Sequence, residues 1–336
     1  MTSVLCHIGL AKCASTTLQS SWHRSSNYYG YFSQDLVSTV RDSVGKNRSD
    51  IPQFKKLLLQ NRMSENAFSD VNASYVVISN ESMTDAGVTD ASEPQLARDV
   101  QDCIAISLEA CVDRVLIMVR DPLSWIRSRY YQQIKQGFAY EFSEFVSRHR
   151  PNVIENLDLG GILSRFSRLD SDPVILPMEL MRGNETLFWA EYEGRLRFPA
   201  PDDLIPDSDV INTNVTLTNT MTIHRKLNAV LERLEASVSR GNSEDRAAVM
   251  NALRTSKTWG TRRALTFASA EDLAFLAAEL GMATATEPEF YSLDDTFIDE
   301  IKERFIEPLR DSTIFPYPEI LASYATNLDV NRIEIL

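Results

Sequence analysis

Four short apolar runs recur along the first 180 residues, at residues 4–8, 75–79, 115–119 and 173–177. Each is rich in Val, Ile and Leu, is bounded by polar positions and shows no apolar-polar alternation, which is typical of strands buried on both faces of a parallel sheet. The segments near 51–62, 92–110, 140–149 and 157–169 instead have the pattern of helices. Strands that alternate with helices predict an α/β fold with a central parallel sheet.

The second half of the chain has a different pattern. Residues 199–209 contain three prolines and four aspartates, which predicts an exposed connection. Beyond it, helices are expected at 218–239, 244–254, 270–281 and 296–309. The sequence therefore predicts a core over residues 1–198 and a mostly helical extension over 210–336 that packs on the core.

Charge is also distributed unevenly between residues 1–150 and residues 151–336. Residues 1–150 hold 16 basic and 16 acidic residues, whereas residues 151–336 hold 18 and 31, so the net charge of −13 falls in the second region. An anionic ligand is expected to bind the neutral region. Neither region is basic enough to predict a nucleic-acid-binding surface.

The four cysteines have neither C-x-x-C spacing nor an accompanying histidine cluster, so no zinc site or disulfide framework is predicted. The first residues lack the pattern of a signal peptide, and no apolar run approaches the length of a membrane span. A cytoplasmic protein without a metal is expected.

The loop after the first predicted strand carries a candidate anion site. The chain reads IGLAKCASTTL over residues 8–18, so a strand ends at Gly9, passes Lys12 and enters a Ser/Thr cluster that begins a helix. Backbone N–H groups, the helix N-terminus and a lysine together favour phosphate binding. The spacing is not the G-x-x-x-x-G-K-[ST] of nucleotide kinases. A buried strand followed by a polar helix cap would give a similar pattern.

A second candidate segment follows the third strand. Arg120 lies at the strand tip, Pro122 predicts a helix start, and Ser124 and Ser128 share one face of that helix. An arginine at this position could bind a phosphate, or it could form a buried pair with a carboxylate.

Together the two segments resemble the sulfotransferases that use 3′-phosphoadenosine 5′-phosphosulfate (PAPS). The first is similar to their pattern I-G-x-x-K-x-G-T-T-x-L, with Ala14 in place of glycine and Ser15 in place of threonine. The second is similar to R-x-P-x-x-R-x-x-S-x-Y, with Trp125 in place of the second arginine. The resemblance covers residues 1–180 and implies a three-layer core of the P-loop NTPase type with a helical C-terminal extension.

The resemblance also implies a reaction and roles for residues. PAPS would donate a sulfonate group to an acceptor hydroxyl, with a sugar or polysaccharide as the expected acceptor, and would leave as 3′-phosphoadenosine 5′-phosphate (PAP). The expected ligands of PAPS are Gly9, Lys12, Cys13, Ala14, Ser15, Thr16, Thr17, Arg120, Ser128, Arg262 and Arg263. Lys12 would stabilise the leaving group. Arg262 and Arg263 belong to a basic loop that could equally be an exposed surface.

The general base is expected at the tip of the second strand, where Glu81 follows residues 75–79. His23, on the first helix, is the alternative, and Glu81 could instead pair with a cation. Two other functions stay open. One is a phosphotransferase acting on a small alcohol or nucleoside with ATP and Mg²⁺. The other is a non-catalytic nucleotide-binding module.

Overall fold

A computed structural model describes residues 2–10, 13, 15–31, 34–64, 66–80, 82–85, 94–170, 172–202, 218–239, 246–261, 265, 268, 270–280, 282 and 289–335. Its contacts divide the chain into two compact units. Unit 1 comprises Met1–Trp125, His149–Asn212 and Leu293–Val330, and unit 2 comprises Ile126–Arg148, Thr213–Ser292 and Asn331–Leu336. Each unit takes segments from both halves of the chain. The boundary between residues 198 and 210 that the sequence predicts stays a prediction.

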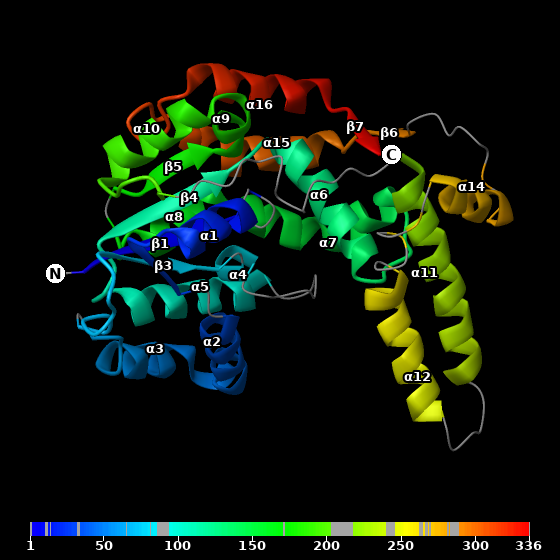
Figure 1. The fold of residues 1–336 in the computed structure, drawn as a ribbon, viewed down its shortest axis with the longest axis horizontal. Helices are drawn as coiled ribbons and strands as arrows, with labels where there is room; N and C mark the ends of the chain where they lie inside the picture. Colours follow the sequence, from blue (N-terminus) through cyan, green and yellow to red (C-terminus); the bar gives the residue numbers. More distant parts are fainter. Residues whose placement is uncertain are drawn as a thin grey trace. The chain divides into compact units, whose positions relative to one another are not determined.

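Unit 1 is built on a five-stranded parallel sheet (Figure 1). Its strands, in the spatial order β2-β3-β1-β4-β5, are β1 (Ser3–Gly9), β2 (Tyr28–Tyr31), β3 (Tyr75–Ser79), β4 (Arg114–Val119) and β5 (Val174–Pro177). The central strands β1, β3 and β4 are almost wholly buried, as their continuous apolar sequences require. The predicted α/β fold with a central parallel sheet is confirmed.

Helices cover both faces of this sheet. The connection from β1 to β2 and that from β3 to β4 run in opposite directions along the sheet, so right-handed crossovers put α1 (Ser15–Arg24) and α5 (Pro94–Leu108) on opposite faces. On one face, Trp22 Nε1 of α1 donates to the Tyr192 hydroxyl of α10 (Glu185–Leu196) at 3.3 Å. On the other, α5 packs against α8 (Leu159–Phe166), and α2 (Gln34–Lys46) and α3 (Ile51–Gln60) lie outside α5 (Figure 1).

Shorter elements and the last helices complete unit 1. They are η1 (Arg48–Asp50), α4 (Ser82–Asp85), α9 (Met178–Gly183), α15 (Asp295–Ile301), the π-helical turn η4 (Lys302–Ile306), the 3₁₀ turn η5 (Glu307–Arg310) and α16 (Pro318–Val330). Side-chain caps fix several helix starts, because a short polar side chain can accept a hydrogen bond from a free N–H of the first turn. The capping residues of α3, α8, α10 and α15 are Asp50, Asp158, Asn184 and Asp294.

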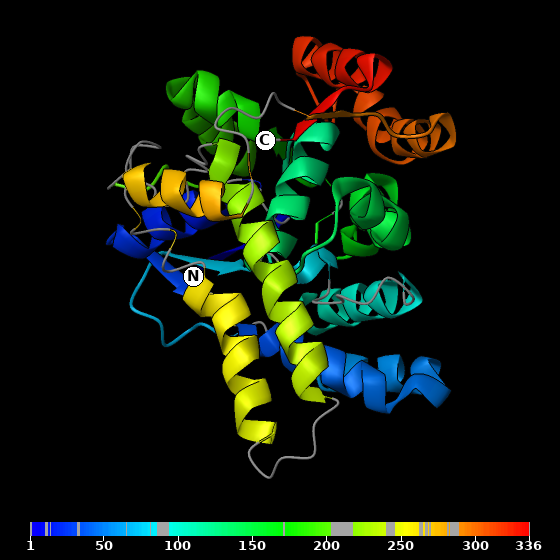
Figure 2. The same ribbon diagram turned by 90° about the vertical axis from the view of Figure 1, so that its right-hand side faces the viewer.

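Unit 2 is mainly helical. It holds α11 (Thr218–Ser239), α12 (Arg246–Thr255), the π-helical turn η3 (Ser256–Gly260), α14 (Ala270–Glu279) and an antiparallel pair of strands, β6 (Glu289–Tyr291) and β7 (Ile333–Ile335). The neighbouring helices α11 and α12 pack side by side (Figures 1 and 2). Its apolar cluster contains Ile223, Leu265, Leu273, Ala277 and Met282. Two helices, α6 (Pro122–Lys135) and α7 (Phe142–Leu157), contribute residues to both units.

Most of the predicted elements lie where the structure has them, within a few residues at each end, but the helix predicted over 140–149 continues to Leu157 as α7. The aromatic segment at Tyr28–Tyr31 is an edge strand of the main sheet, paired with β3. The helix predicted over 296–309 is instead α15 followed by η4 and η5. The sequence did not predict α2, α16, β6 or β7. In the described part of the chain, no helix combines the length and the apolar character that crossing a membrane would need.

Candidate functional site

The strand order places a topological switch point between β1 and β4. From β1 the chain proceeds toward β2 on one side of the sheet, and from β4 it proceeds toward β5 on the other. Gly9 is the register partner of Met118, so the carboxyl ends of these two neighbouring strands lie level with each other. Ligands of open α/β sheets bind in the crevice where such connections diverge. Both segments with candidate chemistry start at this point.

The peptide between Gly9 and Leu10 is held from both sides. Its carbonyl oxygen accepts a hydrogen bond from the Thr84 hydroxyl at 3.1 Å, and its N–H donates to the Met118 carbonyl at 3.4 Å. Three residues after Leu10, the Cys13 N–H donates to the Leu10 carbonyl at 3.0 Å, and the Cys13 side chain is fully buried. The start of the loop is therefore fixed by α4 on one side and β4 on the other.

The helix that follows the loop begins at Ser15. Thr16 is exposed at this end, whereas Thr17 and Leu18 are buried. Because α1 starts at the carboxyl edge of the sheet and carries no acidic residue in its first turn, the positive end of its dipole favours an anion there. Lys12 and Ala14 lie outside the described residues, as does the side chain of Ser15.

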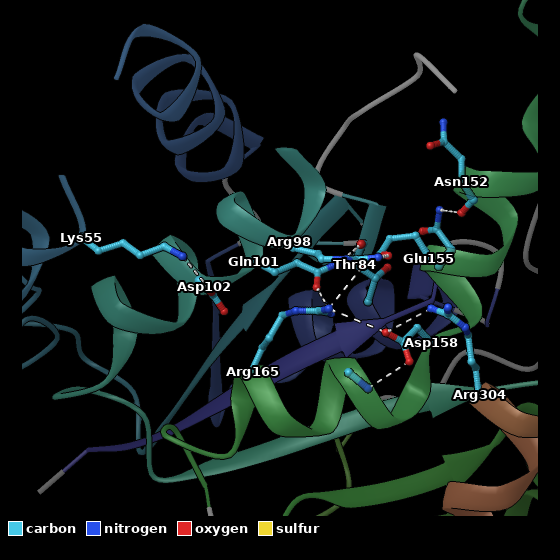
Figure 3. Close-up of polar contacts among 12 residues, drawn as sticks. Lys55, Thr84, Arg98, Gln101, Asp102, Asn152, Glu155, Asp158, Arg165 and Arg304 are labelled. Carbon is cyan, nitrogen blue, oxygen red and sulfur yellow. Dashed lines mark hydrogen bonds and ion pairs between the residues drawn. The ribbon is translucent and has the colours of Figure 1, made fainter. Parts of the chain in front are cut away.

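A chain of polar side chains connects α4, α5, α7 and α8 (Figure 3). Gln101 of α5 donates to the Thr84 carbonyl, and its own amide oxygen accepts from Arg165 of α8 at 2.8 Å. Arg165 also contacts Glu155 at 3.3 Å, and Glu155 accepts two further bonds from Arg98 at 2.7 and 2.9 Å. Glu155 is only 2% exposed, so both arginines are needed to offset the loss of its hydration.

The tip of β4 is fixed by a second group of polar contacts. The Asp121 N–H donates to Glu179 of α9 at 3.0 Å, and the Asp121 carboxylate caps α6 by accepting the Ser124 N–H at 2.7 Å. Asn327 of α16 donates to the other Asp121 oxygen at 2.9 Å, and the Tyr324 hydroxyl donates to Glu179. Arg120, half-buried, directly precedes this group. We call Asp121, Glu179, Tyr324 and Asn327 the strand-tip network.

The other predicted site residues are distributed as follows. His23 is exposed in the last turn of α1, about 12 Å along the helix axis from Ser15, so the structure does not bring it to the carboxyl edge. Ser128 is buried on α6 in the part that belongs to unit 2, and its predicted role rests on the sequence alone. Glu81, Arg262 and Arg263 lie outside the described residues. Glu81 immediately precedes α4, whose Thr84 bonds to the Gly9 carbonyl.

Sequence reasoning missed Thr84 and most of the strand-tip network. Asp121 had a usable signal, because an aspartate before a proline at the first helical position is typical of a helix cap. Glu179, Tyr324 and Asn327 are separated from Asp121 by 58 to 206 positions, so only the tertiary fold brings them to it.

The chemistry of the site is that of an anion cradle. The residue types at this edge favour an anion, because the first turn of α1 has no acidic residue and Arg120 directly follows β4. The Asp121 and Glu179 carboxylates accept the hydrogen bonds described above. Within the described residues, no group of three or more His, Cys, Asp or Glu side chains could hold a metal ion. The four cysteines are buried and form no disulfide bond.

Models of known protein families, curated proteins and solved structures were each compared with the chain, and none of the three comparisons finds a match.

Proposed function

We propose that this protein is a sulfotransferase of the P-loop type that moves a sulfonate group from PAPS to an acceptor hydroxyl. The observation that carries the proposal is the pairing of β1 with β4 at the switch point. Two sequence segments with the spacing of the 5′-phosphosulfate and 3′-phosphate motifs follow neighbouring strands whose ends are level, although they are about 110 residues apart in the chain.

In this proposal the loop from Gly9 to Thr17 binds the 5′-phosphosulfate, and Arg120 binds the 3′-phosphate. The acceptor oxygen attacks sulfur and forms the new S–O bond. The bond from sulfur to the 5′-phosphate oxygen breaks, its electron pair stays on PAP, and the acceptor proton passes to Glu81. Lys12 stabilises the negative charge that develops on the bridging oxygen. The reaction so written needs no metal ion from the protein.

The expected acceptor is a carbohydrate hydroxyl and the expected location is the cytoplasm. Both come from the sequence resemblance. The neutral charge of residues 1–150 supports binding of a multiply anionic nucleotide there, because the large negative charge of the chain is carried elsewhere.

Turnover with labelled PAPS tests this function. We expect the wild-type chain to transfer label to members of a panel of sugars and polysaccharides, with release of PAP. Lys12→Ala is expected to lower the transfer rate by about 100-fold or more, the range seen when one preorganised stabilising group is removed. Glu81→Gln is expected to bind PAP normally and to lose transfer. Consumption of ATP in place of PAPS, or full transfer by both variants, would contradict the proposal.

A further inference from the structure

The last helix of unit 1, α16, reaches the tip of β4. Its Tyr324 is almost fully buried at 1% exposure, packs against Phe305 with ring centroids 6.2 Å apart, and donates a hydrogen bond to Glu179. One turn further on, Asn327 donates to Asp121. Residues more than 200 positions after Arg120 in sequence therefore support the segment that carries it.

The contacts leave the Asp121 residue little freedom. Its N–H is bound by Glu179, one carboxylate oxygen is bound by the Ser124 N–H, and the other is bound by Asn327. The Asp121 N–H belongs to the same planar peptide as the Arg120 carbonyl. A carboxylate that holds this peptide also fixes the direction in which the Arg120 backbone leaves the strand.

Glu179 can hold that peptide only while its own carboxylate is oriented. One of its oxygens bonds to the Asp121 N–H and the other accepts from Tyr324, so each bond restricts rotation of the same group. Burial raises the pKa of Tyr324 well above its usual value, and the neighbouring Glu179 carboxylate raises it further, so the hydroxyl keeps its proton and remains a donor.

We infer that Tyr324 and Glu179 are positioning residues that orient Arg120 toward the 3′-phosphate of an adenine nucleotide and so select nucleotides that carry this phosphate. The inference rests on the proposed function for the identity of the ligand, but its structural part does not. Without the Tyr324 hydroxyl, Glu179 loses one of its two restraints, the Asp121 peptide loosens, and the arginine is no longer held in one direction.

Tyr324→Phe tests the inference, and Tyr317→Phe is a matched control. Tyr317 also donates to a glutamate, Glu191, at 2.9 Å within unit 1, but it is no member of the strand-tip network. Each variant removes one hydroxyl and keeps the ring. Titration with PAP and with 5′-AMP, which lacks the 3′-phosphate, separates a specific effect from a general loss of stability.

We expect Tyr324→Phe to weaken PAP binding by about fivefold or more, the effect of losing one hydrogen bond, and to leave 5′-AMP binding unchanged. Tyr317→Phe is expected to change neither affinity. If Tyr324→Phe weakens both nucleotides equally, or neither, the role in selecting the 3′-phosphate is overturned.

Hydrogen exchange of the Asp121 amide gives a readout that needs no nucleotide. We expect this amide to exchange faster in Tyr324→Phe than in the wild type and in Tyr317→Phe. Unchanged exchange would overturn the positioning inference whatever the nucleotides do. The amide could exchange faster in Tyr324→Phe while the wild-type protein binds no PAP. That result would support the positioning of the strand tip by Tyr324 and would refute the proposed sulfotransferase function.

Discussion

At the scale of single residues, several buried polar groups at the carboxyl edge of the sheet accept hydrogen bonds from neighbouring elements. Thr84 is fully buried, and its hydroxyl donates a hydrogen bond to the carbonyl oxygen of Gly9, the last residue of β1. A buried carbonyl that loses such a partner is costly, because neither water nor another donor replaces it.

Thr84→Val keeps the shape of the side chain and removes the donor. We expect it to lower the free energy of unfolding by about 1–3 kcal/mol, the penalty for a buried unsatisfied polar group. Thr84→Ser keeps the hydroxyl and serves as the control, with a smaller loss from the missing methyl group. Urea denaturation of the three proteins measures the difference. Equal stability of the valine variant and the wild type would show that the bond to Gly9 contributes nothing.

His7 predicts a pH dependence of stability. Its Nδ1 lies 2.7 Å from the Ser79 Oγ, and burial lowers the pKa of His7 from 6.5 to about 3. The folded protein therefore disfavours the protonated ring, while the unfolded chain protonates it below pH 6.5. The contribution of His7 is fully present above pH 6.5 and is lost as pH falls from 6.5 toward 3, by about 1.4 kcal/mol for each pH unit.

Denaturation of the wild type and of His7→Gln at pH values from 4 to 7 measures this contribution. We expect the loss of stability on acidification to be shallower in the variant, because glutamine does not titrate. If the variant fails to fold, an NMR titration of the His7 ring in the wild type gives the same information. A ring that titrates near pH 6.5 in the folded protein would contradict the prediction.

At the scale of elements, two helices of unit 1 each contain a glycine, and the space around the two glycines differs. In α8, Asp158 caps the helix by accepting the Gly161 N–H at 3.2 Å, and a Cβ added to Gly161 would collide with the Asp158 carboxylate. In α10, Gly194 is exposed and a Cβ added there would meet no atom within 4 Å. The same substitution is therefore expected to act in opposite directions.

We expect Gly194→Ala to raise the free energy of unfolding by about 0.5–1 kcal/mol, because alanine loses less backbone entropy on forming a helix. Gly161→Ala is expected to lower it by about 0.5–2 kcal/mol, the value of a disrupted cap. Thermal denaturation distinguishes the two variants. A stabilising effect at Gly161 would show that the Asp158 cap can move without cost.

At the scale of the whole molecule, the sequence predicted those elements whose pattern lies within one short segment, and it missed those that form only through contacts between distant segments. The runs at 75–79 and 115–119 are apolar and β-branched, so their pattern identifies β3 and most of β4 without reference to neighbours. The pairing of β6 with β7 joins residues more than 40 positions apart and was not predicted. The same holds for the site. The segments containing Lys12 and Arg120 have local motifs, whereas Tyr324 reaches Glu179 only through the tertiary fold.

We propose that the carboxyl edge of this sheet binds a 3′-phosphorylated adenine nucleotide. Calorimetric titration of the wild type and Arg120→Ala with PAP, with ADP and with ATP plus Mg²⁺ measures this binding. We predict that the wild type binds PAP in preference to ADP and ATP, and that Arg120→Ala loses this preference. Preferential binding of ATP with Mg²⁺ would instead indicate a phosphotransferase, and binding of none of the three would contradict a nucleotide site at this edge.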